Sequence, residues 1–169
     1  MTTRTFSLVV GIVFLLVGLL GFIDALKTLP PADAPTLSVS AGYGYLLGLF
    51  PVNMLHNFVH LGIGVWGLTS YRNYPAARTF AYGLMIFYGA LAVMGLIPVL
   101  NTTFGLIPIF GHDVWLHALT ALAAAYFWRA PAEVDVRSSR LDRSRPPVTA
   151  RALLNSKQMS SRLLKNPVL

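Results

Sequence analysis

The sequence predicts an all-α membrane protein: a bundle of four transmembrane helices with both termini in the cytoplasm. Hydrophobic residues make up 55% of the 169-residue chain and charged residues only 11%, an imbalance that soluble globular domains do not have. The charged residues are also segregated, which leaves four uncharged stretches at 6–23, 46–71, 79–112 and 114–128. Because a helix needs about 20 apolar residues to cross the hydrocarbon core, these stretches indicate four spans.

We expect the four helices at about 5–25, 51–71, 78–98 and 112–129. The first is longer than the apolar core of a secretion signal and lacks a good cleavage site after it, so we interpret it as a membrane helix. Pro51 suits the first turn of the second helix, where a missing N–H costs nothing. The loop at 27–45 is rich in Pro, Ala, Ser and Gly, and we expect it to be irregular.

The basic residues predict the orientation. With the N-terminus inside, twelve Lys and Arg residues are cytoplasmic and only Lys27 is outside. Residues 1–130 then form the transmembrane domain, and 131–169 form a basic cytoplasmic tail that is partly disordered or docked on a partner. We expect this tail to bind anionic lipid headgroups or simply to fix the topology. Nucleic acid is not an expected partner, because no aromatic residues interleave with these charges.

One face of the second predicted helix carries polar side chains near its start and glycines towards its end. Six residues at spacings i, i+3, i+4, i+7, i+11 and i+14 share an arc of about 100°: Asn53, His56, Asn57, His60, Gly64 and Gly67. In a membrane helix such a stripe faces other protein, because polar groups need partners and small residues allow close packing.

The predicted topology gathers the histidines in the outer leaflet. His56 and His60 lie in the outer half of the second helix, and His112 and His117 lie at the outer start of the fourth. Asp24 and Asp113 are on the same side. Asp113, His117, Thr120 and Ala124 form a second polar-to-small stripe, so we expect the second and fourth helices to lie face to face.

Three hypotheses fit this patch. The polar side chains hydrogen-bond across helices and only specify packing; or they form a proton or ion pathway; or they hold a transition metal, haem b or chlorophyll. In the last case His60, the deepest, is the expected ligand, with His56 and His117 as co-ligands. His112, Asp24 and Asp113 would then complete the shell or orient an imidazole N–H. The chain has no cysteine, which excludes thiolate sites.

A short motif at the start of the second helix resembles a known family. Gly48-Leu49-Phe50-Pro51-Val52-Asn53, followed by Leu55-His56-Asn57 and His60-Leu61, is similar to the signature of a bacterial four-span membrane family known as domain of unknown function 4383. The hydropathy layout of residues 3–128 resembles it as well. The resemblance implies the fold and a bacterial inner or thylakoid membrane, and it implies no activity.

We therefore expect a small, non-enzymatic, multi-pass membrane protein. Its expected role is that of an accessory or scaffold subunit, in contact with other membrane subunits or a second copy of itself, with a histidine patch suited to ligating a cofactor. The alternative is a metal- or haem-dependent membrane oxidoreductase. No catalytic triad, phosphate-binding loop or catalytic carboxylate pair is recognisable in the sequence.

The orientation is testable with reporter fusions. Fusions after Asn73 and after Arg137 should both report a cytoplasmic location, because twelve of the thirteen basic residues fall on that side. A fusion in the loop at 27–45 serves as the external control. A periplasmic signal after Asn73 or Arg137 would contradict the outer-leaflet placement of the histidines.

Overall fold

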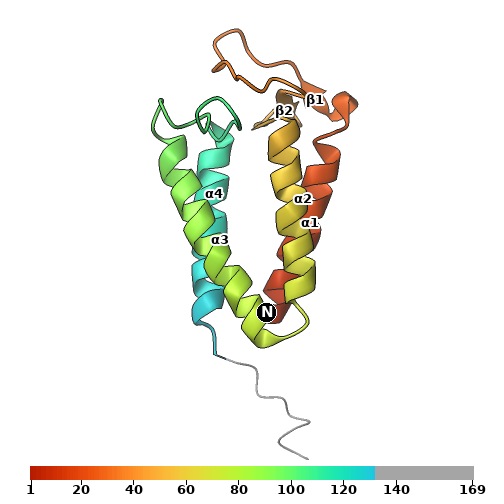
Figure 1. Cartoon of the computed structure of the whole chain (residues 1–169), viewed down its shortest axis with the longest axis vertical. Helices are drawn as coiled ribbons and strands as arrows, with labels where there is room; N and C mark the ends of the chain where they lie inside the picture. The colour runs from red at the N-terminus through yellow and green to blue at the C-terminus, as the bar shows by residue number, and fades with distance from the viewer. Residues whose placement is uncertain (132–169) are drawn as a thin grey trace, which may run out of the picture. The chain divides into compact units, whose positions relative to one another are not determined.

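The computed structural model describes residues 1–131; the predicted basic tail lies outside the described residues. Within this range four α-helices run alternately up and down (Figure 1): α1 (Thr3–Leu20), α2 (Met54–Ser70), α3 (Tyr74–Gly95) and α4 (His112–Arg129). The predicted helical fold is confirmed. By length and composition, α1 and α3 are able to cross a membrane, whereas α2 and α4 do not reach the same combination of length and hydropathy.

Asparagine side chains fix the start of two helices. The Oδ1 of Asn53 accepts a hydrogen bond from the amide of His56 at 2.9 Å, and Asn73 does the same for Ala76 at 3.0 Å. Each bond satisfies an amide that the first turn of a helix leaves unpaired. The expectation that Pro51 opens the second helix is wrong. Pro51 lies in an edge strand, a position that tolerates a residue without an N–H.

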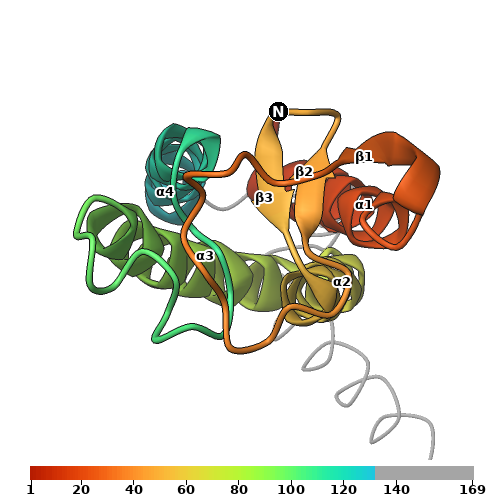
Figure 2. The same cartoon turned by 90° about the horizontal axis from the view of Figure 1, so that it is seen from above.

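The loop expected to be irregular, 27–45, instead belongs to a small antiparallel sheet whose third strand follows it. Its strands are β1 (Lys27–Thr28), β2 (Gly44–Leu46) and β3 (Phe50–Val52), in the order β1-β2-β3, after a single 3-10 turn η1 (Asp24–Leu26). Figure 2 shows this sheet lying across one end of the helices. Strands of two or three residues are too short to show the alternation of apolar and polar residues that predicts a strand, so they could not be recognised from the sequence. We call this end of the molecule, with residues 21–53 and 96–111, the lid end.

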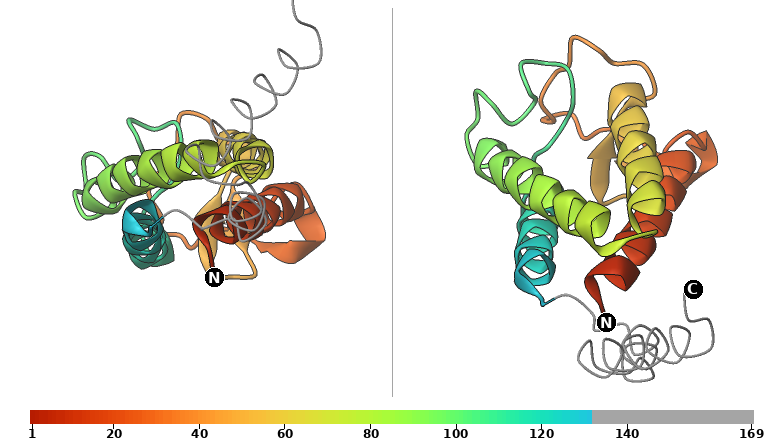
Figure 3. Two further views of the ribbon diagram at one scale, coloured as in Figure 1. Left: turned by 90° about the horizontal axis from the view of Figure 1, so that it is seen from below. Right: turned by 60° about the horizontal axis from the view of Figure 1, so that its bottom comes forward.

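The helices associate as two hairpins, α1 with α2 and α3 with α4 (Figure 3). Glycines bring the first pair close together. A Cβ placed on Gly67 would lie 2.7 Å from the Cα of Gly11, and one placed on Gly64 would lie 2.8 Å from the backbone nitrogen of Leu15. The predicted helix–helix contact at Gly64 and Gly67 is therefore present, and it joins α2 to α1.

Apolar side chains fill the space between the hairpins, and many more cover the outside. The buried cluster comes from all four helices: Phe6, Ile63, Phe80, Ala81, Leu84, Tyr88, Ala121 and Ala124. Large exposed apolar residues include Leu16, Phe58, Ile86 and Leu122. A surface this apolar is suited to contact with lipid or with other apolar protein.

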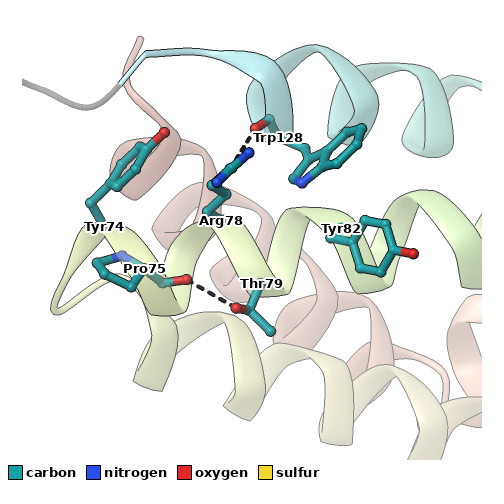
Figure 4. A pocket seen from close by; sticks show the side chains of 6 residues that line it. All are labelled: Tyr74, Pro75, Arg78, Thr79, Tyr82 and Trp128. Carbon is teal, nitrogen blue, oxygen red and sulfur yellow. Dashed lines mark hydrogen bonds between the residues drawn. The ribbon is translucent and has the colours of Figure 1, made fainter.

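The end opposite the lid is tied by two arginines. The Nε of Arg4 on α1 donates to the carbonyl of Tyr71 at 2.9 Å, and the Nε of Arg78 on α3 donates to the carbonyl of Trp128 at 3.2 Å. Each arginine thus satisfies a carbonyl at the end of the second helix of its hairpin. A groove of about 560 Å³ surrounds Arg78 (Figure 4), and Tyr74, Thr79, Tyr82 and Trp128 are among the residues that line it.

The glycine contact makes a clear prediction about stability. Gly67→Leu should push α1 away from α2 and lower the free energy of unfolding by about 1–3 kcal/mol, the usual cost of overpacking. Thermal unfolding in detergent, followed by circular dichroism, measures this.

Gly62→Leu is the matched control, because a Cβ at Gly62 meets nothing within 4 Å. Both variants gain about 1 kcal/mol of helix propensity from the change of Gly to Leu, so this contribution cancels when they are compared. Equal melting temperatures for the two variants would contradict the close packing of α1 and α2.

Candidate functional site

Two imidazoles and one carboxylate converge inside the bundle near the lid end. One ligand atom each from His56, Asp113 and His117 lies within 4.8 Å of the other two. All three residues are buried, with relative exposures of 4%, 3% and 3%. We call these three residues the His–Asp cluster.

The local structure explains why these side chains meet. His56 lies in the first turn of α2, three residues after the capping Asn53. Asp113 and His117 lie four residues apart at the start of α4, so they project from one face of that helix. The cluster therefore joins the starts of two helices that both run away from the lid, one from each hairpin.

Aromatic rings and a third imidazole enclose the cluster. The ring of His60 lies 4.4 Å from that of His56, measured between centroids, and the ring of Tyr88 lies 5.1 Å from that of His117. Phe14 of α1 contacts both, at 5.2 Å from His60 and 5.4 Å from Tyr88. These rings make the surroundings apolar, which strengthens any electrostatic interaction inside.

The polar atoms of the site are left without partners. Within residues 1–131, the Nδ1 atoms of His56, His60 and His117, the Oδ2 of Asp113 and the Oδ1 of Asn57 are buried and make no hydrogen bond. Such groups are normally paired in proteins, because burying them unpaired costs about 1–3 kcal/mol each. Their concentration in one place is the property that distinguishes this region.

The predicted site residues divide into two groups. His56, His60, His117 and Asp113 come together, with Asp113 in the cluster itself and His60 beside it. His112 and Asp24 do not join them. His112 is exposed and its Nδ1 accepts a hydrogen bond from the Trp115 indole at 3.0 Å. Asp24 pairs with Lys27 at 2.9 Å, and its side chain is 93% exposed.

The expected face-to-face packing of α2 and α4 is only partly correct. Their histidines meet across the bundle, with the rings of His56 and His117 6.4 Å apart. The helices themselves pack elsewhere, because the glycines of α2 hold it against α1 and not against α4. The stripe on α2 therefore serves two neighbours: His56 turns to α4, whereas Asn57 lies against Gly21 at the end of α1 and the glycines of the stripe pack on α1.

Asn53 has a role that its place in the stripe did not indicate. Besides capping α2, its Nδ2 donates to the carbonyl of Val39 at 2.8 Å and to that of Leu106 at 2.6 Å. One side chain thus connects the two long loops at the lid end. The signal for the cap was present in the sequence, as an asparagine just before an apolar helix. The two loop contacts are long-range and leave no sequence signal.

Further bonds close the lid above the cluster. The amides of Ser38 and Val39 both donate to the carbonyl of Gly105, at 2.8 and 3.2 Å. In the same loop the Tyr43 hydroxyl donates to the carbonyl of Pro35 at 3.3 Å. Burial, assisted by the neighbouring Tyr45, raises the pKa of the Tyr43 phenol to about 12, so it stays neutral. The bonds to Gly105 connect the two lid loops at the end of the bundle where the His–Asp cluster lies.

Two histidines and one carboxylate are a recognised ligand set for divalent transition metals. Nitrogen and oxygen ligands of zinc lie about 2.0–2.2 Å from the ion, so two ligand atoms of a tetrahedral ion are roughly 3.4 Å apart. The three ligand atoms in this structure lie within 4.8 Å of one another. Binding of one ion by all three therefore requires the side chains to move closer together by up to about 1.4 Å.

Comparison with known proteins identifies the family. The family model described as "Domain of unknown function (DUF4383)" matches residues 4–129, and the chain belongs to this family. This confirms the resemblance predicted from the motif at the start of α2. No curated protein and no solved structure matches the chain.

The loop contacts of Asn53 give a testable prediction. Asn53→Ala removes both loop contacts as well as the cap, so hydrogen exchange at the amides of Ser38 and Val39 should become faster by about tenfold or more. Hydrogen–deuterium exchange with peptide-level mass spectrometry measures it.

Asn73→Ala is the control, because Asn73 caps α3 at the other end and its Oδ1 accepts the same kind of bond. That variant should lose the stability of one cap, about 1 kcal/mol, with unchanged exchange at residues 38 and 39. Unchanged exchange in both variants would show that Asn53 does not hold the lid loops.

Proposed function

We propose that this member of the DUF4383 family is a four-span membrane protein that holds a divalent transition-metal ion between its two hairpins. In this proposal it is an accessory or scaffold subunit of a membrane complex, located in a bacterial inner or thylakoid membrane with both termini cytoplasmic. The observation that carries the metal site is the convergence of a buried carboxylate and two buried imidazoles whose Nδ1 atoms make no hydrogen bond within residues 1–131.

The length of the helices supports four spans. α2 has 17 residues and α4 has 18, which correspond to about 26 and 27 Å of helix, against a hydrocarbon core of about 30 Å. Both run beside α1 and α3, the two helices that meet the length and hydropathy requirement on their own. Large apolar residues are exposed on α2 and α4 too, among them Phe58, Val65, Leu119 and Leu122.

The distribution of charge supports the orientation. Four arginines belong to the end that holds the N-terminus: Arg4, Arg72, Arg78 and Arg129. Lys27 and the three acidic residues of the described range, Asp24, Asp33 and Asp113, belong to the lid end. An excess of basic residues at one end is the feature that retains that end in the cytoplasm.

The other two hypotheses for the histidines are less well supported. Hydrogen bonding within the protein accounts for Asn53, whose amide and carbonyl oxygen pair with two loops and with the first turn of α2. The Nδ1 atoms of the three buried histidines have no partner within residues 1–131. A proton pathway needs polar groups along the whole bundle. Below the cluster, the buried hydroxyls of Ser7 and Thr3 already donate to backbone carbonyls.

A metal ion also suits the available space better than a tetrapyrrole. The two cavities that the histidines line measure about 100 and 260 Å³. Both are smaller than the roughly 300–1,000 Å³ of pockets for drug-sized ligands, and haem or chlorophyll is larger than such a ligand. The second candidate function is a metal-dependent oxidoreductase. The ligand set favours it, because two histidines and a carboxylate leave coordination positions on the ion open.

Metal analysis of the purified protein tests the site. We expect the wild-type protein to bind about one divalent ion per chain after incubation with Fe²⁺, Zn²⁺ or Co²⁺, as three ligands suffice for one ion. His56→Ala and His117→Ala should each weaken binding by more than about tenfold, since changes even to groups behind the ligands have effects of that size.

His112→Ala is the matched control, because it removes a histidine from the same helix that lies outside the cluster. It should retain the metal. A wild-type protein that binds none of the three ions, or a loss of metal in His112→Ala equal to that in His117→Ala, would overturn the proposal.

A further inference from the structure

The groove around Arg78 lies at the end of the bundle opposite the lid, and the proposed metal site makes no use of it. Its volume is about 560 Å³. Most of its wall comes from the start of α3, and Trp128 near the end of α4 forms the other side. Figure 4 shows Arg78 between Tyr74 and Tyr82 along α3, opposite Trp128.

Positive charge gathers at this groove. Arg78 lines it, and Arg129 lies nearby on α4: their guanidinium carbons are 5.9 and 5.5 Å from the centroid of the Trp128 ring. Within residues 1–131, the acidic residues all belong to the lid end. An anion that enters the groove is therefore attracted by two guanidinium groups.

Arg78 is held in an orientation that suits an oxyanion. Its Nε donates to the carbonyl of Trp128 at 3.2 Å, which fixes the plane of the guanidinium group. Its two terminal nitrogens make no hydrogen bond within residues 1–131, and the residue is exposed. The planar fork of an arginine pairs with two oxygens of a phosphate or carboxylate, and a fork already held in place loses less conformational freedom when it binds.

The surface next to Arg78 is apolar. Tyr82 lies four residues further along α3, on the same face and about 6 Å further from the end of the bundle. Its ring lies 5.3 Å from that of Trp128 between centroids and is 47% exposed. Ile86 follows at the same spacing and is 55% exposed. Along α3 the cation is thus followed by an aromatic surface and then by an aliphatic one.

This order of groups matches the order of groups in a phospholipid, from the charged phosphate to the acyl chains. The volume of the groove falls within the roughly 300–1,000 Å³ of pockets for drug-sized ligands, so a phosphate ion or the carboxylate of a fatty acid does not fill it. Tyrosine and tryptophan are enriched at the level of lipid headgroups, and basic pockets between membrane helices bind anionic headgroups.

We propose that this groove binds one anionic phospholipid, with its phosphate at Arg78 and its acyl chains along Tyr82 and Ile86. The site belongs to the helical bundle and is separate from the basic tail, whose expected attraction to anionic headgroups requires no groove. The inference rests on the proposed membrane location and orientation, which place this end at the anionic cytoplasmic leaflet. It does not depend on the proposed metal site.

Lipid binding by the full chain tests the proposal. Native mass spectrometry of the detergent-solubilised protein counts bound molecules during titration with phosphatidylglycerol, phosphatidylcholine or inorganic phosphate. We expect one phosphatidylglycerol to bind about tenfold more tightly than phosphatidylcholine, since each arginine near an anionic headgroup is worth a factor of about five. Equal affinity for the two lipids, or inorganic phosphate that binds as tightly as phosphatidylglycerol, would overturn the proposal.

Arginine variants locate the site. Arg78→Gln should weaken the binding of phosphatidylglycerol about fivefold or more, because it removes the charge that lines the groove. Arg72→Gln is the matched control, since it removes an exposed arginine from the same end outside the groove. Both variants have the same net charge, so attraction by the basic tail is equal in them. An equal loss of affinity in both would overturn the proposal.

Tyr82→Ala provides a second test if Arg78→Gln fails to fold, because it leaves the bond from Arg78 to Trp128 in place. Loss of the ring removes apolar surface from the lipid, so we expect severalfold weaker binding. Tyr126→Ala is its control, since Tyr126 is 71% exposed on α4 and does not line the groove. Unchanged affinity in both Arg78→Gln and Tyr82→Ala would reject the groove as the site.

The same titrations separate this proposal from the proposed function. His56→Ala should bind phosphatidylglycerol as the wild-type protein does, because the His–Asp cluster lies at the lid end. A protein that binds no metal but shows the expected loss in Arg78→Gln would reject the metal site alone. Titration in detergent does not depend on orientation, so an inverted topology would be seen in the reporter fusions and not in lipid affinity.

Discussion

The need to pair polar groups inside an apolar bundle governs this structure. Little water reaches the interior, so each buried donor or acceptor must find a partner in the protein or in a ligand. Asn53 meets this requirement fully, with its amide group and its carbonyl oxygen both bonded. The three buried histidines do not, and two of them, His56 and His60, lie within two turns of Asn53 on α2. In the proposed metal site, a bound ion would supply the missing partner.

The glycine contact determines where the histidines point. Because Gly64 and Gly67 hold α2 against α1, the orientation of α2 about its own axis is fixed by backbone contact along half its length. The other half of the same stripe then turns its imidazoles towards α4 and α3. The close packing at the glycine end of α2 therefore determines the direction of the unpaired imidazoles at its other end.

Much of this arrangement was accessible from the sequence, for identifiable reasons. Runs of uncharged residues located the four helices, and the 3.6-residue period placed Asn57, His60 and Gly64 on a buried face. The meeting of His56 with His117 followed from topology alone, because both helices start at the lid end. Membership of the family was likewise recognisable from the residues around Asn53.

Other features depend on tertiary contacts that no local pattern encodes. The sheet of β1–β3 is built from strands too short to show alternation, and its pairing of Gly44 with Val52 joins residues on either side of a turn. Asp24 was grouped with the histidines because it lies on the same side of the membrane in the predicted topology, yet Lys27 holds it at the surface. Asp113 was expected either to complete the ligand shell or to orient an imidazole N–H, and the position at which α4 begins brings its carboxylate within 4.8 Å of the ligand atoms of His56 and His117.

Because the bundle consists of two hairpins, the His–Asp cluster connects two separate parts of the structure. His56 belongs to one hairpin, while Asp113 and His117 belong to the other. Any ion that all three groups hold binds best at one separation of the hairpins, so occupancy and hairpin spacing are thermodynamically coupled. By the same reciprocity, a neighbouring subunit that spread or compressed the hairpins would change the affinity for the ion. An ion bound at the cluster would therefore link the two halves of the bundle, and its affinity would depend on the distance between them.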